Sequence, residues 1–262
     1  MRGTRDAQRR QQLVTARVSV DAAGERFREA ASLGTLHDLD GQEFTVPGIA
    51  PGELVRWVYE NGMVGSKDGR VVYEQILAAA PDERCPMCGH GMVRTLDHFL
   101  PKRLFPALCV DPLNLVPACA DCNHVKGERI PADAETTLLH PYLDRIDQDA
   151  WLHAQVADSS PVWLEFFVSP PSHWEDILIE RTTYHFKLFG LARLFAVQAN
   201  RTVHSIRRQL TAMLGAGGKD MVRAYLADEA ETRLAARLNG WEGVTYRALA
   251  QDDAFCGGAF IL

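Results

Sequence analysis

The chain has 262 residues and a net charge of −6, with 47% hydrophobic and 24% charged residues. These are ordinary values for a globular protein, so they exclude a disordered chain and allow either one large domain or a small module with additions. No stretch reaches the roughly 18 to 20 apolar residues of a membrane span, and the opening MRGTRDAQRRQQL lacks the apolar core of a signal peptide. We therefore expect a cytoplasmic protein without a membrane segment.

The region from residue 1 to 81 is expected to contain short helices. Residues 1 to about 20 are rich in Arg and Gln with little apolar periodicity, which predicts a frayed or extended arm. Apolar residues then recur at helical spacing from Ala22 to Leu33, and again in the runs GELVRWVYENG and DGRVVYEQILAAA. These patterns predict short helices that lead into Cys85.

Four cysteines stand in two pairs at a spacing typical of zinc ligands. Cys85 and Cys88 form the first Cys-x-x-Cys unit, and Cys119 and Cys122 form the second. Four thiolates held in this way complete a tetrahedral zinc site, whereas so few clustered cysteines do not indicate a disulfide framework. The 30 residues between the pairs exceed the roughly 15 to 20 of a common zinc ribbon, so further elements are inserted there.

The inserted segment carries polar residues in a distinctive order. These are Asp97-His98, then Asn114 in DPLNLVP, then the run Cys-x-x-Cys-Asn-x-x-Lys-Gly that ends at Gly127. Framed by the two cysteine pairs, they resemble the HNH nucleases, which have the ββα-metal fold. The resemblance covers about Arg84 to Arg129. It implies metal-dependent hydrolysis of phosphodiester bonds that leaves 5′-phosphate and 3′-hydroxyl ends.

The resemblance also implies a role for each polar residue. His98 corresponds to the general base, because a neutral imidazole with a pKa near ~6.5 can take a proton from water at cellular pH. Asn114 resembles the residue that holds the base in place. Asp97 and Asn123 resemble the ligands of a single catalytic Mg²⁺ or Mn²⁺ ion, for which oxygen ligands are suited.

Two points stay open at this stage. Successive residues of a regular strand point to opposite faces, so Asp97 and His98 can serve one phosphate only at a strand end or a bulge. Many relatives carry histidine directly after the last cysteine, whereas this chain has Asn123 followed by His124. We favour Asn123 as the metal ligand, because His124 points ~100° further around a helix.

Residues 131 to 262 are expected to be mainly helical with a short β element. The runs WLHAQV and VWLEFFVSPPS predict one or two strands before Pro170. Helices are predicted from Trp174 to Leu214 and from Lys219 to Leu238, with a loop over Gly215 to Gly218 between them. The tail WEGVTYRALAQDDAF predicts one more short helix.

Basic residues are concentrated between Arg181 and Lys219, where Asp and Glu are absent. This stretch is a candidate cationic face for a nucleic-acid backbone, with Arg207 and Arg208 as candidate contacts. A basic run is more often a solvated helix surface, so this run indicates nucleic-acid binding only in combination with the nuclease motif. Within the motif, Lys102 and Lys126 are the candidate phosphate contacts.

The remaining cysteines and histidines are assigned no role. Cys109 and Cys256 have no partner at ligand spacing and are expected to be buried structural residues. His140 precedes a proline and is expected to be a packed or turn histidine, and His90 and His153 receive no assignment.

The sequence thus predicts an α+β protein in which a small zinc-bound ββα-metal module, residues 82–130, lies between residues 1–81 and a mainly helical region, 131–262. Its predicted function is that of a metal-dependent endonuclease acting on nucleic acid, with DNA as the first choice over RNA. Two settings stay open: the chain acts alone, or, as the resemblance to defence-associated HNH nucleases implies, it is the nuclease subunit of an anti-phage defence system with an ATPase partner protein. The alternative from another class is a zinc-dependent nucleic-acid-binding module without hydrolysis.

Overall fold

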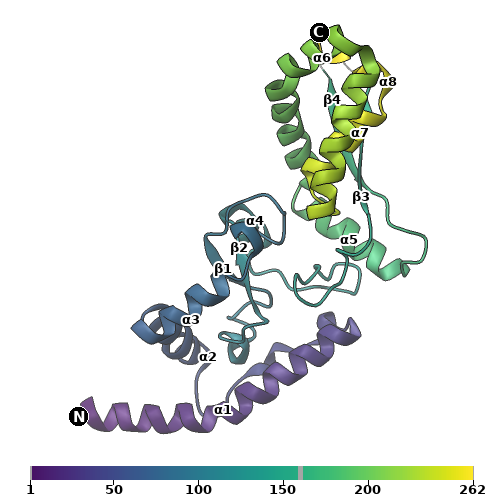
Figure 1. Cartoon of the computed structure of the whole chain (residues 1–262). Coiled ribbons are helices and arrows are strands. Elements are labelled where there is room, and N and C mark those ends of the chain that lie inside the picture. The colour runs from purple at the N-terminus through teal and green to yellow at the C-terminus, as the bar shows by residue number, and fades with distance from the viewer. Residues whose placement is uncertain (1, 159–161, 262) are drawn as a thin grey trace. The chain divides into compact units, whose positions relative to one another are not determined.

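The computed structural model of the chain describes residues 2–158 and 162–261. It divides into two compact units, Met1–Asp144 and Arg145–Leu262, which are described separately. Each unit combines helices with one two-stranded antiparallel sheet, so the α+β prediction is confirmed (Figure 1). Among the described residues, no helix combines the length and the apolar character that crossing a bilayer requires.

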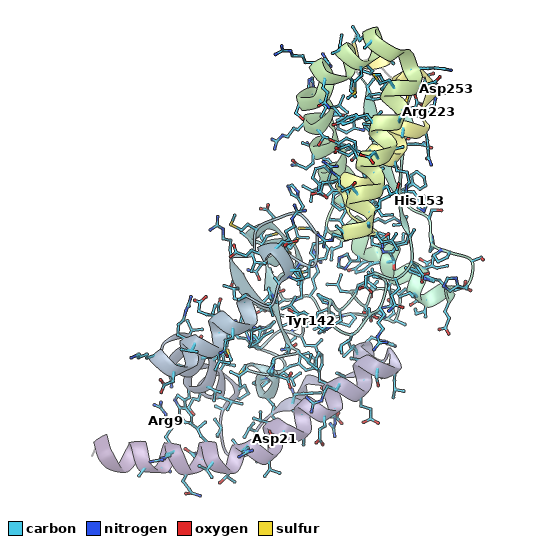
Figure 2. The ribbon with its side chains drawn as sticks, in the orientation of Figure 1. Arg9, Asp21, Tyr142, His153, Arg223 and Asp253 are labelled. Atoms are coloured by element: carbon cyan, nitrogen blue, oxygen red, sulfur yellow. The ribbon has the colours of Figure 1, made fainter. Side chains whose placement is uncertain are left out.

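The first unit begins with a long helix, α1 (Arg2–Leu33). The prediction of an extended arm over residues 1 to about 20 is therefore wrong. Arg, Gln and Ala favour a helix even where no apolar face forms, and most side chains between residues 7 and 20 are exposed. Arg9, labelled in Figure 2, nonetheless stacks on the Trp57 ring, with its Cζ 5.3 Å from the ring centroid. The Gln12 side chain donates a hydrogen bond to the Gly48 carbonyl.

Two helical segments follow at the predicted places. Helix α2 (Pro51–Leu54) continues into a π-helix, η3 (Val55–Val64). Helix α3 (Lys67–Leu77) is N-capped by Ser66, whose hydroxyl accepts from the Gly69 amide. Gly69 has no space for a side chain, because a Cβ there would lie 2.1 Å from the Gly62 carbonyl oxygen. This close approach brings η3 and α3 together. Short 3-10 turns occupy Leu36–Asp38, Gly41–Phe44, Pro81–Glu83, Pro106–Leu108 and, in the second unit, Ala259–Ile261.

A ββα arrangement completes the first unit. Strand β1 (Thr95–His98) pairs antiparallel with β2 (Leu115–Ala118), and α4 (Ala120–Lys126) follows directly (Figure 1). Helix α3 packs against both strands, and a small core joins them: Met63, Tyr73, Leu96 and Leu115. The N-terminal helices therefore support the strand that carries Asp97 and His98.

The second unit is a hairpin packed on helices. Strand β3 (Leu152–Ala157) pairs antiparallel with β4 (Trp163–Val168), which confirms the predicted β element. The helices are α5 (Asp176–Leu188), α6 (Leu191–Ala236), α7 (Trp241–Gln251) and α8 (Asp253–Cys256). Arg223 of α6 forms an ion pair with Asp253 of α8 (Figure 2).

The loop predicted from Gly215 to Gly218 is shorter than expected. Gly215 and Gly217 continue the helix, and only Gly218 leaves helical geometry, with φ 69° and ψ −166°. Such a positive φ is accessible to glycine at little cost. A single residue therefore divides α6 into two arms.

Candidate metal centre and catalytic site

The four cysteines of the two Cys-x-x-Cys units converge in space, as predicted. Cys85 and Cys88 lie in the turn before β1, whereas Cys119 caps α4 and Cys122 lies in its first turn. All four are buried, and their sulfur atoms lie within 4.8 Å of one another. A tetrahedral zinc ion with Zn–S bonds of about 2.3 Å places its sulfur ligands about 3.8 Å apart. The cluster could therefore hold a metal such as zinc.

Backbone geometry orients the thiols toward one another. The Gly91 amide donates to Cys88 Sγ at 3.3 Å, and the Cys122 amide donates to Cys119 Sγ at 3.4 Å. Hydrogen bonds within the cluster, first of all with Cys119, lower the pKa of the Cys88 thiol and raise the pKa of the Cys85 and Cys122 thiols, so Cys88 is the thiol that most readily forms a metal-binding thiolate. A Cβ on Gly91 would lie 2.8 Å from Cys119 Sγ. Only glycine fits at this position of the first knuckle.

Asp97 lies beside a buried cation that comes from α4. Lys126 Nζ lies 3.0 Å from Asp97 Oδ2 and donates a hydrogen bond of 2.6 Å to the backbone oxygen of His98. The ion pair lacks hydrogen-bond geometry at Asp97 Oδ2, which is buried without a hydrogen-bonding partner among the described residues. Burial raises the pKa of Asp97 and lowers that of Lys126, and each charge opposes the shift of the other.

The structure corrects the predicted role of Lys126. Its side chain is 1% exposed, so the ammonium group is enclosed by the protein and does not face a phosphate. Instead, Lys126 joins α4 to the end of β1 through its contacts with Asp97 and with the backbone of His98.

His98 is held in one tautomer by its surroundings. Its Nε2 lies 2.9 Å from the Cys109 carbonyl oxygen. Because a carbonyl only accepts hydrogen bonds, Nε2 carries the proton and Nδ1 keeps its lone pair. Burial lowers the pKa of His98 to about 4, and the charges of Lys102 and Lys126 act in the same direction. The ring is therefore neutral at cellular pH, with Nδ1 as its proton acceptor.

Asn114 acts on His98 through the loop between the strands. Its Oδ1 accepts from the Leu100 amide at 2.7 Å, and its Nδ2 donates to the Leu100 and Leu108 carbonyls at 3.1 Å. These bonds fix a loop whose end supplies the Cys109 carbonyl that orients His98. Asn114 is completely buried, and its placement agrees with the positioning role that the motif implies.

The strand geometry is that of a strand end and not of a bulge. The pairing of β1 with β2 is regular through His98 and Leu115, and His98 is the last residue of β1. Asp97 faces Lys126, while the His98 ring contacts Tyr59. The negative charge of Asp97 also contributes to the raised pKa of Tyr59. Asp97 and His98 therefore lie together at the end of β1, and both interact with Tyr59.

Tyr59 is a residue of the candidate site that the sequence did not predict. Its ring packs edge-on against His98 with 4.6 Å between the ring centroids, and Lys102 Nζ lies 5.4 Å from the same ring. Burial raises the pKa of the Tyr59 hydroxyl to about 12. Tyr59 belongs to η3, outside the motif, so no local signal in the sequence connects it with His98.

On α4, Asn123 and His124 have different surroundings. Asn123 is half-buried and lies one turn before Lys126, on the side of the helix that faces Asp97. His124 is exposed, which agrees with its expected position further around the helix. Lys102 is half-buried beside Tyr59 and stays a candidate phosphate contact.

The two predicted basic contacts of the second unit differ in exposure. Arg208 is exposed on α6, whereas Arg207 is half-buried and its Nε is enclosed without a hydrogen bond among the described residues. Arg207 is thus less available to a phosphate than the sequence suggested. The structure instead aligns Arg208 with other cations of α6.

The residues without an assigned role are packed as expected. His140 is 1% exposed, its Nε2 donates to the Leu113 carbonyl, and its ring lies 4.5 Å from that of Phe99. Cys109 and Cys256 are both buried. His140 therefore supports the loop that precedes β2 and is not exposed to a substrate.

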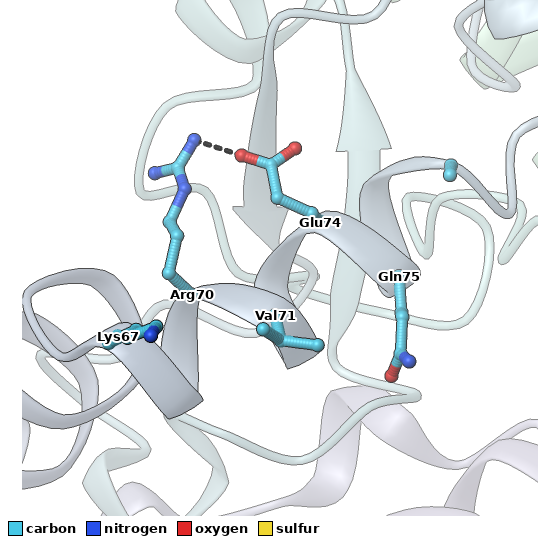
Figure 3. A pocket seen from close by; sticks show the side chains of 6 residues that line it. Lys67, Arg70, Val71, Glu74 and Gln75 are labelled. Atoms are coloured by element: carbon cyan, nitrogen blue, oxygen red, sulfur yellow. Dashed lines mark ion pairs between the residues drawn. The ribbon is translucent and has the colours of Figure 1, made fainter.

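A shallow hollow lies on one side of α3 (Figure 3). All of its lining residues come from that helix or its end: Lys67, Arg70, Val71, Glu74, Gln75 and Ala78. Arg70 and Glu74 pair with each other across one turn. None of the motif residues lines this hollow, so it is separate from the candidate site.

Replacing Lys126 with methionine is expected to destabilise the first unit by about 3 kcal/mol, because the Asp97 carboxylate would lose its buried counter-charge. Urea unfolding of the full chain measures the change. In the double variant Asp97→Asn/Lys126→Met, both charges are gone, so the loss should be clearly smaller than the sum of the two single losses. Lys102→Met is the matched control and should cost less than about 1 kcal/mol. Additive losses would contradict a coupled pair.

Comparisons with known proteins find a relative in a bacteriophage. No family model matches the chain, and no solved structure matches it. Protein ea31 of Escherichia phage lambda is 28% identical over 255 residues, which cover 89% of this chain and 86% of ea31. The aligned 89% of this chain is longer than either compact unit, so the similarity includes residues of both units. The chain is thus similar, over most of its length, to a protein of a bacteriophage.

Proposed function

We propose that this chain is a metal-dependent nuclease of the HNH type that hydrolyses phosphodiester bonds of nucleic acid, with DNA as the first choice. The observation that carries the proposal is His98, a neutral imidazole with a free Nδ1, fixed at a strand end next to Asp97. The ββα arrangement around four clustered cysteines supports it, because this is the arrangement that the motif implies.

His98 would take the proton from the attacking water on Nδ1. The Cys109 carbonyl would stabilise the imidazolium that forms, because it accepts from Nε2–H throughout. An anionic phosphate beside the ring would raise the low pKa of His98 toward the working pH. Asn114 maintains this geometry by holding the loop that ends at Cys109.

Asp97 and Asn123 would hold the catalytic divalent ion. The donor set suits a hard cation, because Asp97 offers carboxylate oxygens and Asn123 a half-buried amide oxygen on the side of α4 that carries Lys126, although Asp97 Oδ2 also pairs with Lys126. When bound, a Mg²⁺ or Mn²⁺ ion would stabilise the charge on the leaving 3′ oxygen. Lys126 would hold the Asp97 side chain in position for this task.

The direct test is cleavage by the purified full chain. Plasmid DNA, single-stranded DNA and RNA are incubated with Mg²⁺ or Mn²⁺, and the products are examined for nicks and for 5′-phosphate ends. Cleavage of at least one substrate is expected. A zinc-loaded, folded protein that cleaves none of them with either ion contradicts the proposal.

A zinc-dependent binding module without hydrolysis is the second candidate. The observation that favours it is the Asp97–Lys126 pair, because a carboxylate already neutralised by an ammonium group binds a divalent ion less strongly. Binding of nucleic acid without any cleavage would select this candidate over the first.

Tyr59 is expected to position the base. Tyr59→Leu should lower kcat of cleavage about tenfold to hundredfold, because the His98 ring would lose the aromatic edge that fixes its orientation. Tyr59→Phe keeps the ring and is the matched control, with little change in kcat. Nuclear magnetic resonance of the His98 ring protons gives a second measurement, since only Tyr59→Leu removes the ring-current shift. Equal activity of both variants would contradict the positioning role.

The biological setting stays a prediction. The resemblance implies an ATPase partner protein in anti-phage defence, and the bacteriophage relative carries a name that says nothing of an activity or a partner. Affinity purification of the tagged chain from its own host, followed by identification of co-purified proteins, tests whether an ATPase accompanies it.

A further inference from the structure

Four exposed residues follow one side of the first arm of α6: Arg193, Arg201, His204 and Arg208. At 100° per residue they fall within a sector of about 80°, and at 1.5 Å per residue they extend over about 22 Å. We call them the α6 stripe. The stripe is a property of the folded helix, since its members are up to 15 positions apart in the sequence.

The apolar side of the same arm is already buried within its own unit. The buried residues of this arm are Leu191, Phe195, Ala196, Ala199, Val203, Ile206 and Leu210. By the same helical geometry they occupy the side opposite the stripe. Along this sector the helix therefore exposes Arg193, Arg201, His204 and Arg208, whereas Val197, which lies in the same sector, is half-buried.

The arginines of the stripe have no carboxylate partner among the described residues, in contrast to eight other arginines of the chain. Among the residues that the structure describes, no carboxylate pairs with Arg193, Arg201 or Arg208, and Arg201 makes only a long contact of 3.5 Å with Gln198. Elsewhere the arginines with carboxylate partners are Arg17, Arg26, Arg28, Arg56, Arg70, Arg103, Arg223 and Arg233. The sequence from 181 to 219 contains no acidic residue that could neutralise the stripe locally.

We infer that the α6 stripe binds the phosphate backbone of a nucleic acid. Arginine suits this partner, because its planar guanidinium group forms bidentate hydrogen bonds with phosphate oxygens. Asn200, which flanks the stripe by helical position, can donate a further hydrogen bond from its amide group to phosphate or sugar. A membrane surface fits less well, because among the described residues of this arm no large apolar side chain is exposed for insertion. The choice of partner rests on the proposed function, but the binding itself needs no cleavage.

The test measures binding by the full chain carrying His98→Ala, so that nucleic acid stays intact. The triple variant Arg193→Gln/Arg201→Gln/Arg208→Gln removes the charges, and glutamine preserves the helix because its helix propensity is close to that of arginine. The matched control, Arg10→Gln/Arg17→Gln/Arg56→Gln, removes the same charge from exposed positions of the first unit. Fluorescence anisotropy with labelled duplex and single-stranded DNA gives Kd between about 50 and 200 mM salt.

The stripe variant is expected to bind DNA at least tenfold more weakly than the parent at the lowest salt. Its slope of log K against log salt should be smaller by about two to three, because each phosphate left without its arginine lowers the slope by about one unit. The control should keep the slope of the parent. Equal weakening in both variants, or unchanged binding of the stripe variant, would overturn the inference.

Two further outcomes distinguish a failure of this inference from a failure of the proposed nuclease function. If the parent binds vesicles of anionic lipid or an acidic polypeptide through the stripe but does not bind DNA, the inference is wrong. If the chain with His98 intact cleaves nothing while stripe-dependent DNA binding persists, the inference holds and the proposed nuclease function fails.

Discussion

His98→Ala is expected to lower the rate of phosphodiester cleavage by roughly 10²- to 10⁴-fold, while zinc content and DNA affinity stay unchanged. The reason is the hydrogen bond that Nε2–H donates to the Cys109 carbonyl, which leaves Nδ1 as the ring atom that can accept the proton of water. Alanine provides no proton acceptor at this position. Single-turnover cleavage of labelled DNA with Mg²⁺ measures the effect without interference from product release.

Because His98 is buried, its removal also leaves a cavity beside Tyr59. A second variant, His98→Gln, keeps an N–H group that can donate to the Cys109 carbonyl but has no basic nitrogen. It should be as inactive as the alanine variant and closer to the parent in thermal stability. His124→Ala, at an exposed position of α4, is the matched control and should cleave normally. Normal cleavage by both His98 variants would overturn the assignment of the base.

Cys85→Ala, or removal of zinc by a chelator, is expected to unfold the candidate nuclease module. Four buried thiols lie within 4.8 Å of one another, and without a metal they would have to share this small volume with only weak hydrogen bonds between them. Structural zinc sites contribute about 10 to 16 kcal/mol of apparent binding free energy at neutral pH, which is more than the usual stability of a domain. The loss of one cysteine ligand is therefore expected to be enough to unfold the module.

Metal content by atomic absorption and susceptibility to limited proteolysis measure this effect. Cys109→Ala is the matched control, because Cys109 is equally buried in the same unit but lies outside the cluster. It should keep one zinc per chain and resist proteolysis as the parent does. A Cys85→Ala protein that remains folded and protease-resistant without metal would show that the cluster is not a structural metal site.

Many helices and strands could be predicted from the spacing of apolar residues, because local sequence patterns determine local structure. Apolar spacing predicted the helices before Cys85, and aromatic and β-branched residues predicted β3 and β4. The failures occurred where no apolar pattern exists. The mostly exposed first half of α1 forms a helix mainly from propensity, with a few contacts such as that of Arg9 with Trp57. The glycine run ending at Gly218 breaks α6 at a single residue.

The sequence by itself determined which residues carry the candidate chemistry: the ligand spacing of the four cysteines and the order of Asp97, His98, Asn114 and Asn123. Only the tertiary structure decided what each can do. Lys126 comes from a helix 28 positions after His98 and is a buried partner of Asp97, and the tautomer of His98 depends on a carbonyl of another loop. Burial and hydrogen bonding arise from contacts between distant segments, which no local spacing encodes. For the same reason no local pattern connects Tyr59 with His98, whereas the α6 stripe follows from the periodicity of a single helix and needed from the structure only the exposure of its members and their lack of carboxylate partners.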